Sequence, residues 1–401
     1  MESRNFSGSL VVAVSVIGLS LNVGTVLVYA FAVFLKPLTA EFHWTRSQVS
    51  LAVSLLNLVV CLGSPLVGRI VDRLGGRVTI VPSIVLLGAT LVSLRFLSGH
   101  LWHLYLLYSI AGLVGLGGTS LTYSRVVAGW FDERRGLALG VTSSGIGLGS
   151  FVIPPLAQSF ITTGGWRHAY FLLGLLVLGV ALPLVGLLLR DSPAVKYAPH
   201  ERTHTSGDAL RTRVFWQMML QFFVVSACVN GTMAHLSALL TDRGITPQAA
   251  AFAIAVFGGS AFVGRLVTGY LLDRFFAPYV MVVLFGGAAM ALLLLAAGAA
   301  GPLALLAAVL MGLGAGAEAD VMPYLISRYF GLRSLGELFG YLFSAYTLGV
   351  AAGPVLMGAG FDSTGSYVRP LTILAIALCA ATALTFALPR YPKAFQKARA
   401  E

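Results

Sequence analysis

Apolar runs of about twenty residues alternate with short polar stretches along almost the whole chain. Because about twenty apolar residues in a helix cross the hydrocarbon core of a membrane, each run predicts one spanning helix. The runs cover residues 9–35, 47–70, 78–98, 102–127, 137–161 and 168–190, and then 214–240, 249–272, 278–299, 302–327, 337–360 and 369–389. The pattern predicts an all-α membrane protein with twelve transmembrane helices in two sets of six.

A long polar stretch separates the two sets of apolar runs. Residues 191–213, DSPAVKYAPHERTHTSGDALRTR, are predicted to be a flexible linker on the cytoplasmic side. It joins an N-terminal six-helix half, residues 1–190, to a C-terminal six-helix half, residues 214–401. The first run lacks a small-residue cleavage site, so we expect a spanning helix there rather than a removed signal peptide.

Composition and charge agree with this interpretation. Hydrophobic residues make up 57% of the 401, and charged residues only 10%, at a mean hydropathy of +0.88. With both termini placed in the cytoplasm, the inner loops and tails carry 18 of the 26 Lys and Arg residues and the outer loops carry 5. This bias orients the helices and accounts for most of the net charge of +11 without a nucleic-acid partner. The three cysteines lie inside apolar runs, which argues against a disulfide framework or a metal site.

The two halves repeat each other at a nearly fixed offset. Gly68, Asp72 and Arg73 recur 201 positions later as Gly269, Asp273 and Arg274. Four further residues recur 200 positions later, namely Gly136, Gly140, Gly149 and Pro154 as Gly336, Gly340, Gly349 and Pro354. Such an offset indicates duplication. Parallel duplicated halves with a substrate site near the membrane midplane are a transporter architecture, and the repeat favours alternating access over a channel.

One arginine, Arg265, interrupts the apolar run 249–272. A guanidinium in the middle of a spanning helix costs roughly 2.5–3.5 kcal/mol on insertion scales, so it needs an acidic partner, a water-filled cavity or an anionic ligand. Glu318 and Asp320 interrupt the run 302–327 and, being two residues apart, face different sides of a helix. Buried carboxylates can carry protons at neutral pH. These two are candidates for proton coupling, or alternatively for structural pairing with an arginine.

The motif GRIVDRLGGR at residues 68–77, with its echo at 269–274, resembles the major facilitator superfamily. The number of spans, the two halves and the linker extend this resemblance over the whole chain. Residues 126–149, VVAGWFDERRGLALGVTSSGIGLG, and residues 324–331, YLISRYFG, look like the monocarboxylate and oxalate/formate porter branch. The resemblance implies a major facilitator fold and a gating role for five residues. They are Asp72, Arg73, Asp273, Arg274 and Arg125.

The resemblance also implies a substrate site. Arg265 matches the arginine of the eighth helix that pairs with the substrate carboxylate in this branch, and Tyr324 matches a substrate-facing tyrosine. A guanidinium suits a carboxylate because it donates two parallel hydrogen bonds. The aspartate that animal members carry one turn before the arginine is Ala261 here, and Tyr29 replaces their first-helix lysine. The eleventh run carries no second cation of the kind that oxalate exchangers use, so a monoanion is expected.

Other polar and aromatic residues within the runs complete the predicted site. His235 could relay a proton or donate a hydrogen bond to the substrate, although a single histidine on an apolar helix is often only a structural residue. The further candidates for substrate contact are Asn230, Tyr123, Phe343 and Tyr346. No phosphate-binding Gly-Lys-Ser/Thr loop, metal-ligand spacing or nucleophile elbow occurs, so we expect no enzyme activity, no catalytic residues, no metal and no cofactor beyond the proton gradient.

The sequence therefore predicts a symporter of a lactate- or pyruvate-sized monocarboxylate and a proton, in a bacterial inner membrane. Its partners would be the organic anion, the proton and the bilayer, and the functional unit would be a monomer. Three alternatives stay open. They are an organic-anion exchanger that moves no protons, an exporter of a drug or metabolite, and a non-transporting sensor.

Overall fold

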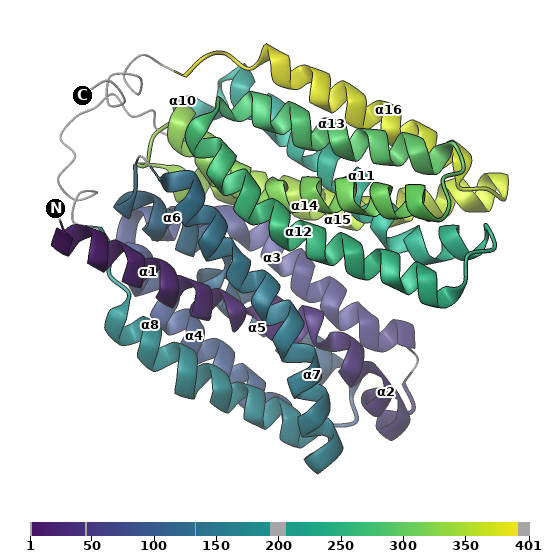
Figure 1. Ribbon diagram of the computed structural model, residues 1–401. Helices are drawn as coiled ribbons and strands as arrows, with labels where there is room; N and C mark the ends of the chain where they lie inside the picture. The colour runs from purple at the N-terminus through teal and green to yellow at the C-terminus, as the bar shows by residue number, and fades with distance from the viewer. Residues whose placement is uncertain (1, 45, 133, 193–205, 392–401) are drawn as a thin grey trace. The chain divides into compact units, whose positions relative to one another are not determined.

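All regular structure in the described part of the chain is helical. The computed structural model describes residues 2–44, 46–132, 134–192 and 206–391, and no strand occurs in these ranges. Helices satisfy their backbone N–H and C=O groups internally, which is what a segment surrounded by lipid requires. Long helices account for most of the ribbon in Figure 1. The prediction of an all-α membrane protein is confirmed.

The chain divides into two compact units. Unit 1 comprises Met1–Asp132, Val141–Thr203 and Leu332–Gly340, and unit 2 comprises Glu133–Gly140, His204–Gly331 and Tyr341–Glu401. Each unit therefore holds most of one predicted half together with a short segment of the other. Positions 193–205 of the predicted linker lie outside the described residues, and Ser206–Leu210, predicted to be flexible, forms the short helix α10.

Unit 1 is built from the helices of the first six predicted spans (Figure 1). They are α1 Glu2–Ser20, the π-helix η1 Gly24–Tyr29, α2 Phe31–Phe42, α3 Arg46–Leu74, α4 Gly76–Leu94, α5 Leu101–Gly115, the 3-10 helix η2 Leu116–Gly118, α6 Ser120–Trp130, α7 Arg135–Leu176, the π-helix η3 Val177–Ala181 and α8 Leu182–Leu188. In this unit α3 and α4 both pack on α5, and α1 packs on α6 and α8.

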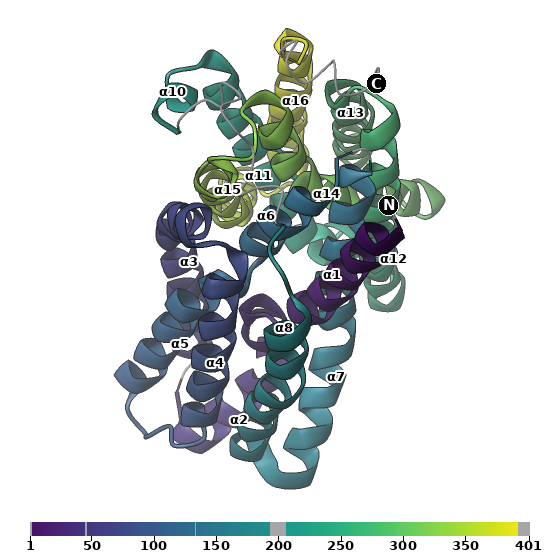
Figure 2. The same cartoon turned by 90° about the vertical axis from the view of Figure 1, so that its left-hand side faces the viewer.

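Unit 2 is built from the helices of the last six predicted spans. They are α10, α11 Arg213–Thr241, α12 Pro247–Arg274, α13 Ala277–Ala296, α14 Pro302–Tyr329, α15 Leu335–Thr364, α16 Val368–Leu384 and the 3-10 helix η4 Thr385–Ala387. Here α14 packs on α12 and α13, and α13 packs on α16. Figure 2, turned by 90° from Figure 1, shows α13 and α16 running alongside each other within this unit.

The described helices form twelve spans when the bent helix α14 is counted as one span and the helix broken at Gly165 is counted as two. Ten helices are long and apolar enough to cross a membrane, and α14 raises the number to eleven. One of the ten, Arg135–Leu188, has 54 residues, which at 1.5 Å per residue is far longer than one span needs. It is broken at Gly165, where φ is +78°. Two spans meeting at Gly165 bring the number to twelve, as predicted.

The fourth span of each unit is broken at the same place in the repeat. In unit 1, η2 and the extended backbone of Thr119 interrupt the span between α5 and α6. In unit 2, α14 bends by 43° between Glu318 and Asp320. Pro323 explains the bend, because it has no N–H for the carbonyl four residues earlier and its ring pushes that carbonyl away. Positions 118 and 319 lie 201 residues apart, which is the offset of the gating motifs.

Glycines allow α12 and α14 to pack with their backbones in contact. A Cβ at Gly316 of α14 would overlap the carbonyl oxygen of Ala261, and one at Gly264 of α12 would lie 2.8 Å from the carbonyl oxygen of Leu313. Small residues at helix crossings are the usual way to bring membrane helices this close. In unit 1, Gly145 and Gly149 of α7 pack in the same way against the backbone of α1.

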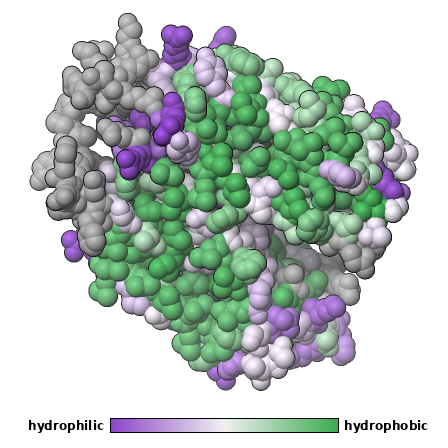
Figure 3. Space-filling view, in the orientation of Figure 1, coloured by the Kyte–Doolittle hydropathy of each residue, from purple (hydrophilic) through white to green (hydrophobic). Residues whose placement is uncertain are grey.

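The sides of the helices are apolar and their ends are polar. In Figure 3 hydrophobic residues cover the helix flanks on this face, while hydrophilic residues gather near the helix ends. Large side chains such as Leu62, Phe151 and Val355 are 73%, 79% and 69% exposed. In water such exposure would favour association, whereas a bilayer offers exposed side chains of this kind an apolar environment.

The α12–α14 crossing yields a stability prediction. Gly316→Ala places a methyl group against the backbone of α12, so overpacking should cost about 1–3 kcal/mol. Gly286→Ala in α13 is the matched control, because no atom lies within 4 Å of a Cβ there. We expect Gly316→Ala to unfold about 2–6 °C below the control in a thermal unfolding experiment in detergent. Equal unfolding temperatures would show that the crossing tolerates a wider spacing.

Candidate functional site

Arg265 lies on α12 at the crossing with α14. The α14 backbone passes directly beside it, since a Cβ at Gly316 would lie 2.9 Å from the backbone nitrogen of Arg265. The side chain is half-buried, and its Nη1 atom is buried without a hydrogen-bond partner. Leaving a buried donor without an acceptor costs about 1–3 kcal/mol, and more for a charged group. Arg265 therefore has an unused donor available for a ligand.

Glu318 presents an unused acceptor on the neighbouring helix. Its side chain is 1% exposed, and its Oε1 atom has no hydrogen-bond partner. The positive charge of Arg265 acts on this carboxylate. Thr268, one turn after Arg265, is also fully buried with an unpaired Oγ1. Thr268 is not among the residues predicted from the sequence, although a hydroxyl one turn from an intramembrane arginine lies on the same helix face.

The bend of α14 lies between the two candidate proton carriers. Glu318 ends the first straight part of the helix and Asp320 begins the second. Asp320 is fully buried, like Glu318. The two carboxylates therefore occupy the one place in α14 where the regular hydrogen-bond ladder is interrupted.

Arg265 has a counterpart in unit 1 that carries no charge. Position 64 lies 201 residues before position 265 and is a serine. A Cβ at Gly140 would lie 2.7 Å from the carbonyl oxygen of Arg265, and one at Gly340 would overlap the carbonyl oxygen of Ser64. The Ser64 hydroxyl donates to the carbonyl oxygen of Val60 at 2.6 Å and is fully buried. The two crossings match in geometry and differ in their polar side chain.

His235 on α11 is held by two partners. Its Nε2 lies 3.1 Å from the carbonyl oxygen of Pro354, and its Nδ1 lies 3.1 Å from the hydroxyl of Tyr367. Because a carbonyl only accepts, Nε2 carries a hydrogen, and in the neutral ring Nδ1 accepts from Tyr367. Burial, followed by the charges of Asp242 and Asp362, raises the pKa of Tyr367, so its hydroxyl keeps its proton. His235 therefore ties α11 to α15, and a relay role for it stays a prediction.

The hydroxyl groups of the predicted tyrosines have different surroundings. Tyr324 is buried and donates to the carbonyl oxygen of Leu272 at 2.6 Å. In this arrangement it cannot also donate to an anion, which counts against its predicted role as a substrate ligand. Tyr123 is fully buried with its unpaired hydroxyl directed at Gly18 of α1, where a Cβ would overlap it. Tyr29 is 49% exposed.

The remaining predicted substrate residues belong to unit 2. Asn230 donates from Nδ2 to the carbonyl oxygen of Ser226 at 3.0 Å, which leaves its Oδ1 and one N–H for other groups. The rings of Phe343 and Tyr346 stack with centroids 5.7 Å apart. Tyr29 and Tyr123 belong to unit 1, whereas Arg265, His235, Asn230, Tyr324, Phe343 and Tyr346 belong to unit 2.

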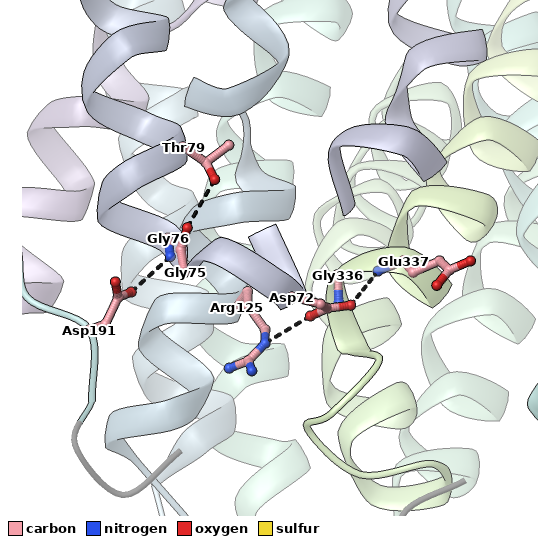
Figure 4. Close-up of polar contacts among 8 residues, drawn as sticks. All are labelled: Asp72, Gly75, Gly76, Thr79, Arg125, Asp191, Gly336 and Glu337. Carbon is pink, nitrogen blue, oxygen red and sulfur yellow. Dashed lines mark hydrogen bonds and ion pairs between the residues drawn. The ribbon is translucent and has the colours of Figure 1, made fainter. Parts of the chain in front are cut away.

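Asp72 caps the beginning of α15 within unit 1 (Figure 4). Its Oδ1 accepts from the backbone N–H of Gly336 at 3.0 Å, and its Oδ2 accepts from that of Glu337 at 2.8 Å. The Nε atom of Arg125 on α6 donates to Oδ1 at 3.0 Å. The first N–H groups of a helix lack intrahelical acceptors, and a carboxylate there also interacts favourably with the helix dipole. Arg125 is thus the ion-pair partner of Asp72, which supports its assignment to the gating set.

Asp273 caps the beginning of α7 in the same way within unit 2. Its Oδ1 accepts from Gly136 N–H at 2.7 Å and its Oδ2 from Leu137 N–H at 2.8 Å. The glycines of the motif permit this approach, since a Cβ at Gly269 would lie 2.6 Å from the carbonyl oxygen of Gly136. The duplicated motif therefore makes a duplicated contact. The less similar copy of the motif at 269–274 therefore keeps the carboxylate that caps a helix in the first copy.

The arginines next to these aspartates have other surroundings. Arg73 and Arg274 are exposed, and Arg274 lies over the ring of Tyr270 at 4.4 Å. The contact with the neighbouring helix is thus made by the aspartate and not by the Asp-Arg pair as a unit. A second ion pair at the Asp72 cap, which is not predicted from the sequence, joins Arg69 Nη2 to Glu337 Oε1 at 2.6 Å. An acidic residue in the first turn of a helix would have suggested it.

These features define a multi-pass membrane protein made of two six-helix repeats, with capped helix ends and an arginine in one spanning helix whose Nη1 has no hydrogen-bond partner. The chain belongs to the Major Facilitator Superfamily, whose sequence profile matches residues 10–354 and 238–401. This confirms the resemblance stated from the motifs. The protein is a transporter and not an enzyme.

Relatives of this chain include two named monocarboxylate transporters and a bacterial MFS-type transporter. Monocarboxylate transporter 11 of Homo sapiens is 30% identical over 377 residues, covering 87% of this chain and 76% of that protein. Monocarboxylate transporter 13 of Rattus norvegicus is 28% identical over 375 residues, covering 90% and 85%. The uncharacterized MFS-type transporter YhjX of Escherichia coli (strain K12) is 27% identical over 348 residues, covering 80% and 81%.

Solved structures share the fold at low sequence identity. The transporter FucP, crystallised in its outward conformation, has a TM-score of 0.72 at 18% identity and covers 96% of this chain and 98% of its own. The proton:xylose symporter XylE has a TM-score of 0.74 at 15% identity and covers 96% of each chain. The major facilitator fold predicted from the sequence is confirmed.

The Asp72 cap yields a prediction on stability. Asp72→Ala removes the acceptor of two N–H groups and leaves the buried Arg125 guanidinium without its counter-ion. Breaking such a pair from one side should cost about 3–5 kcal/mol. Asp72→Asn keeps one acceptor oxygen and should lose less. Thermal unfolding in detergent measures both, with the exposed Asp362→Ala as the control for a lost negative charge. A loss no larger than that of Asp362→Ala would contradict the cap's role.

Proposed function

We propose that this transporter moves a small organic monocarboxylate, of the size of lactate or pyruvate, together with a proton by alternating access. The observation that supports the proposal most directly is the pair of unused buried atoms on α12 and α14, Arg265 Nη1 and Glu318 Oε1. The names of two relatives at 28–30% identity, both monocarboxylate transporters, support the substrate class. We also infer that the chain resides in a bacterial inner membrane with both termini in the cytoplasm, because of the Lys/Arg distribution.

In this mechanism Arg265 binds the substrate carboxylate. A guanidinium can donate two parallel hydrogen bonds to a carboxylate, and Nη1 of Arg265 has no competing partner within the described protein. Gly258 and Gly259, less than two turns before Arg265, have no atoms within 4 Å of a Cβ position. This open space on α12 leaves room for the rest of a small substrate.

Glu318 carries the proton. It is more deeply buried than Arg265, and Oε1 can take up a hydrogen without breaking a bond within the protein. His235, in contrast, already uses both ring nitrogens. Because the charge of Arg265 acts on Glu318 and both ring nitrogens of His235 are engaged, we place Glu318 ahead of Asp320 and His235 as the coupling residue.

Charge balance couples the two ligands. The empty site is neutral when Arg265 is positive and Glu318 is negative. The anion alone makes the site negative, the proton alone makes it positive, and both together restore neutrality. Because an uncompensated charge in a low-dielectric interior is costly, the empty and the fully loaded carrier close readily. The half-loaded states close slowly, and this yields coupled transport of one anion with one proton.

Two alternatives share the fold but not this coupling. An organic-anion exchanger would bind its substrate at Arg265 and leave Glu318 permanently charged. An exporter of a drug or metabolite would not respond to small carboxylates. Both are distinguished from symport by the measurements that follow.

The first test is uptake of labelled lactate into liposomes that contain the purified protein. We expect an inward proton gradient to stimulate uptake in the wild type. Arg265→Ala should lower uptake by about a hundredfold or more, because it removes a charge-assisted bidentate contact. Arg265→Lys keeps the charge without the planar fork and should be intermediate. Gradient-insensitive uptake would refute symport, and no uptake of lactate, pyruvate or larger monocarboxylates would refute the substrate class.

The second test separates coupling from binding. Glu318→Gln imitates the protonated side chain, so the loaded carrier is neutral while the empty carrier is positive. We expect counterflow of labelled against unlabelled substrate to persist, and net gradient-driven uptake to fall at least about tenfold. Asp362→Asn, an exposed carboxylate, is the control. If net uptake by Glu318→Gln still follows the proton gradient, another group carries the proton. Net uptake by Asp320→Asn would then be measured.

A further inference from the structure

The segment that follows the last helix of unit 1 is fastened to the turn after Asp72. Trp130 at the end of α6 donates from Nε1 to the carbonyl oxygen of Arg190 at 2.8 Å. The next residue, Asp191, accepts at Oδ1 from Gly76 N–H at 2.9 Å and at Oδ2 from Arg77 N–H at 3.2 Å. Figure 4 shows Asp191 approaching the beginning of α4 beside the Asp72 cap. We call this arrangement of Trp130, Arg190, Asp191 and Gly76 the first clasp.

The segment that follows the last helix of unit 2 is fastened in the same way. Tyr329 at the end of α14 donates from its hydroxyl to the carbonyl oxygen of Pro389 at 2.7 Å. Two residues later, the hydroxyl of Tyr391 accepts from Ala277 N–H at 3.2 Å. The ring of Tyr391 also packs on Phe276, with centroids 4.8 Å apart. We call the arrangement of Tyr329, Pro389, Tyr391 and Ala277 the second clasp.

The two clasps are equivalent in the repeat. Trp130 and Tyr329 are 199 positions apart, Asp191 and Tyr391 are 200 apart, and Gly76 and Ala277 are 201 apart. These offsets lie within two positions of the 201-residue offset of the gating motifs. The duplicated position has kept its geometry, although a carboxylate in one copy is a phenol in the other. A contact made by chance would have no counterpart at the same offset.

Each clasp lies next to one gating carboxylate. Gly76 follows Asp72 by four residues, and Ala277 follows Asp273 by four residues. In unit 1 the connecting turn contains Gly75 at φ +94°, where a Cβ would lie 2.8 Å from Asp191 Oδ2. A glycine is needed there both for the positive φ and for the approach of Asp191. The first clasp thus fixes the α4 end of the turn between α3 and α4, and Asp72 lies at the α3 end of the same turn.

The two clasps differ in strength. The carboxylate of Asp191 accepts two N–H groups at a helix N-terminus, where a negative charge is favourable. Tyr391 accepts one N–H with a neutral hydroxyl, since burial raises the pKa of Tyr391. The first clasp should therefore hold its turn more tightly than the second.

We propose that Asp191 and Tyr391 are positioning residues, which fix the turns that aim Asp72 at α15 and Asp273 at α7. The effect of these two residues on gating rests on the proposed transport function, whereas their effect on the positions of Asp72 and Asp273 does not. Without Asp191, the first amides of α4 lose their acceptor, the α3–α4 turn relaxes, and Asp72 no longer faces Gly336 and Glu337 continuously. Without the Tyr391 hydroxyl, the same follows for Asp273 and the amides of Gly136 and Leu137.

Hydrogen exchange of the full-length protein in lipid nanodiscs tests the positional part without any substrate. We expect Asp191→Ala to speed exchange at Gly336 and Glu337 about fivefold, in addition to Gly76 and Arg77. Asp191→Asn keeps an acceptor and should restore most of the protection. Tyr391→Phe should raise exchange at Gly136 and Leu137 by a smaller factor. Asp362→Asn and Tyr279→Phe are the controls and should leave these amides unchanged.

The outcomes separate this proposal from the proposed function. Faster exchange confined to Gly76 and Arg77 would reduce Asp191 to a local cap and overturn the proposal. If Asp191→Ala raises hydrogen exchange throughout the chain, the proposal is judged instead from the exchange at Gly336 and Glu337 in Asp191→Asn. In liposomes, Asp191→Ala should lower the maximal rate several-fold and leave the KM unchanged, because substrate contacts are intact. If Asp191→Ala speeds exchange at the Gly336 and Glu337 amides while the wild-type protein does not transport lactate, the positioning role is supported and the proposed substrate is refuted.

Discussion

The first N–H groups of a helix have no acceptor in their own helix. Four helices of this protein solve the problem with a side chain from another segment. Asp72 caps α15, Asp273 caps α7, Asp191 caps α4 and Tyr391 caps α13. Every cap joins segments that are distant in sequence, so the arrangement of the helix ends depends on these few polar contacts. The glycines around them are there to let the caps reach the backbone.

The middle of the helices shows the opposite arrangement. At the helix ends, the half-buried carboxylates of Asp72 and Asp273 each accept two backbone N–H groups. At the α12–α14 crossing, Arg265 and Glu318 retain a buried donor and a buried acceptor without partners. An unsatisfied buried polar atom reduces stability, and natural proteins tolerate this cost mostly where a ligand removes it. The contrast separates polar groups that are satisfied within the protein from polar groups that keep unused donors and acceptors.

Much of this could be predicted from the sequence, because it depends on local composition. The twelve spans follow from run lengths, and the duplicated motif from its offset. The position of Arg265 and Glu318 on packed helices follows from their apolar surroundings. These features need no knowledge of which helices touch.

The remaining features depend on how the helices cross. The partner of Asp72 is Arg125, 53 residues away, and not the adjacent Arg73. Tyr324 uses its hydroxyl on the backbone of α12, which no residue pattern reveals. Asp191 and Tyr391 lie in or near polar segments that resemble ordinary linkers in sequence. A cap is recognised only when the helix end that it serves is known, since any nearby polar side chain can perform the task.

Ser64 occupies in the first repeat the position that Arg265 occupies in the second, so the two repeats differ chemically there. A chain made of two identical copies would offer an anion two interchangeable docking places, and the bound molecule would have no preferred direction. With a guanidinium in one copy and a self-satisfied hydroxyl in the other, that degeneracy is lost. An anion held at Arg265 has a head and a tail relative to the protein. The two repeats would then contribute unlike groups to one bound anion, even though their scaffold is repeated.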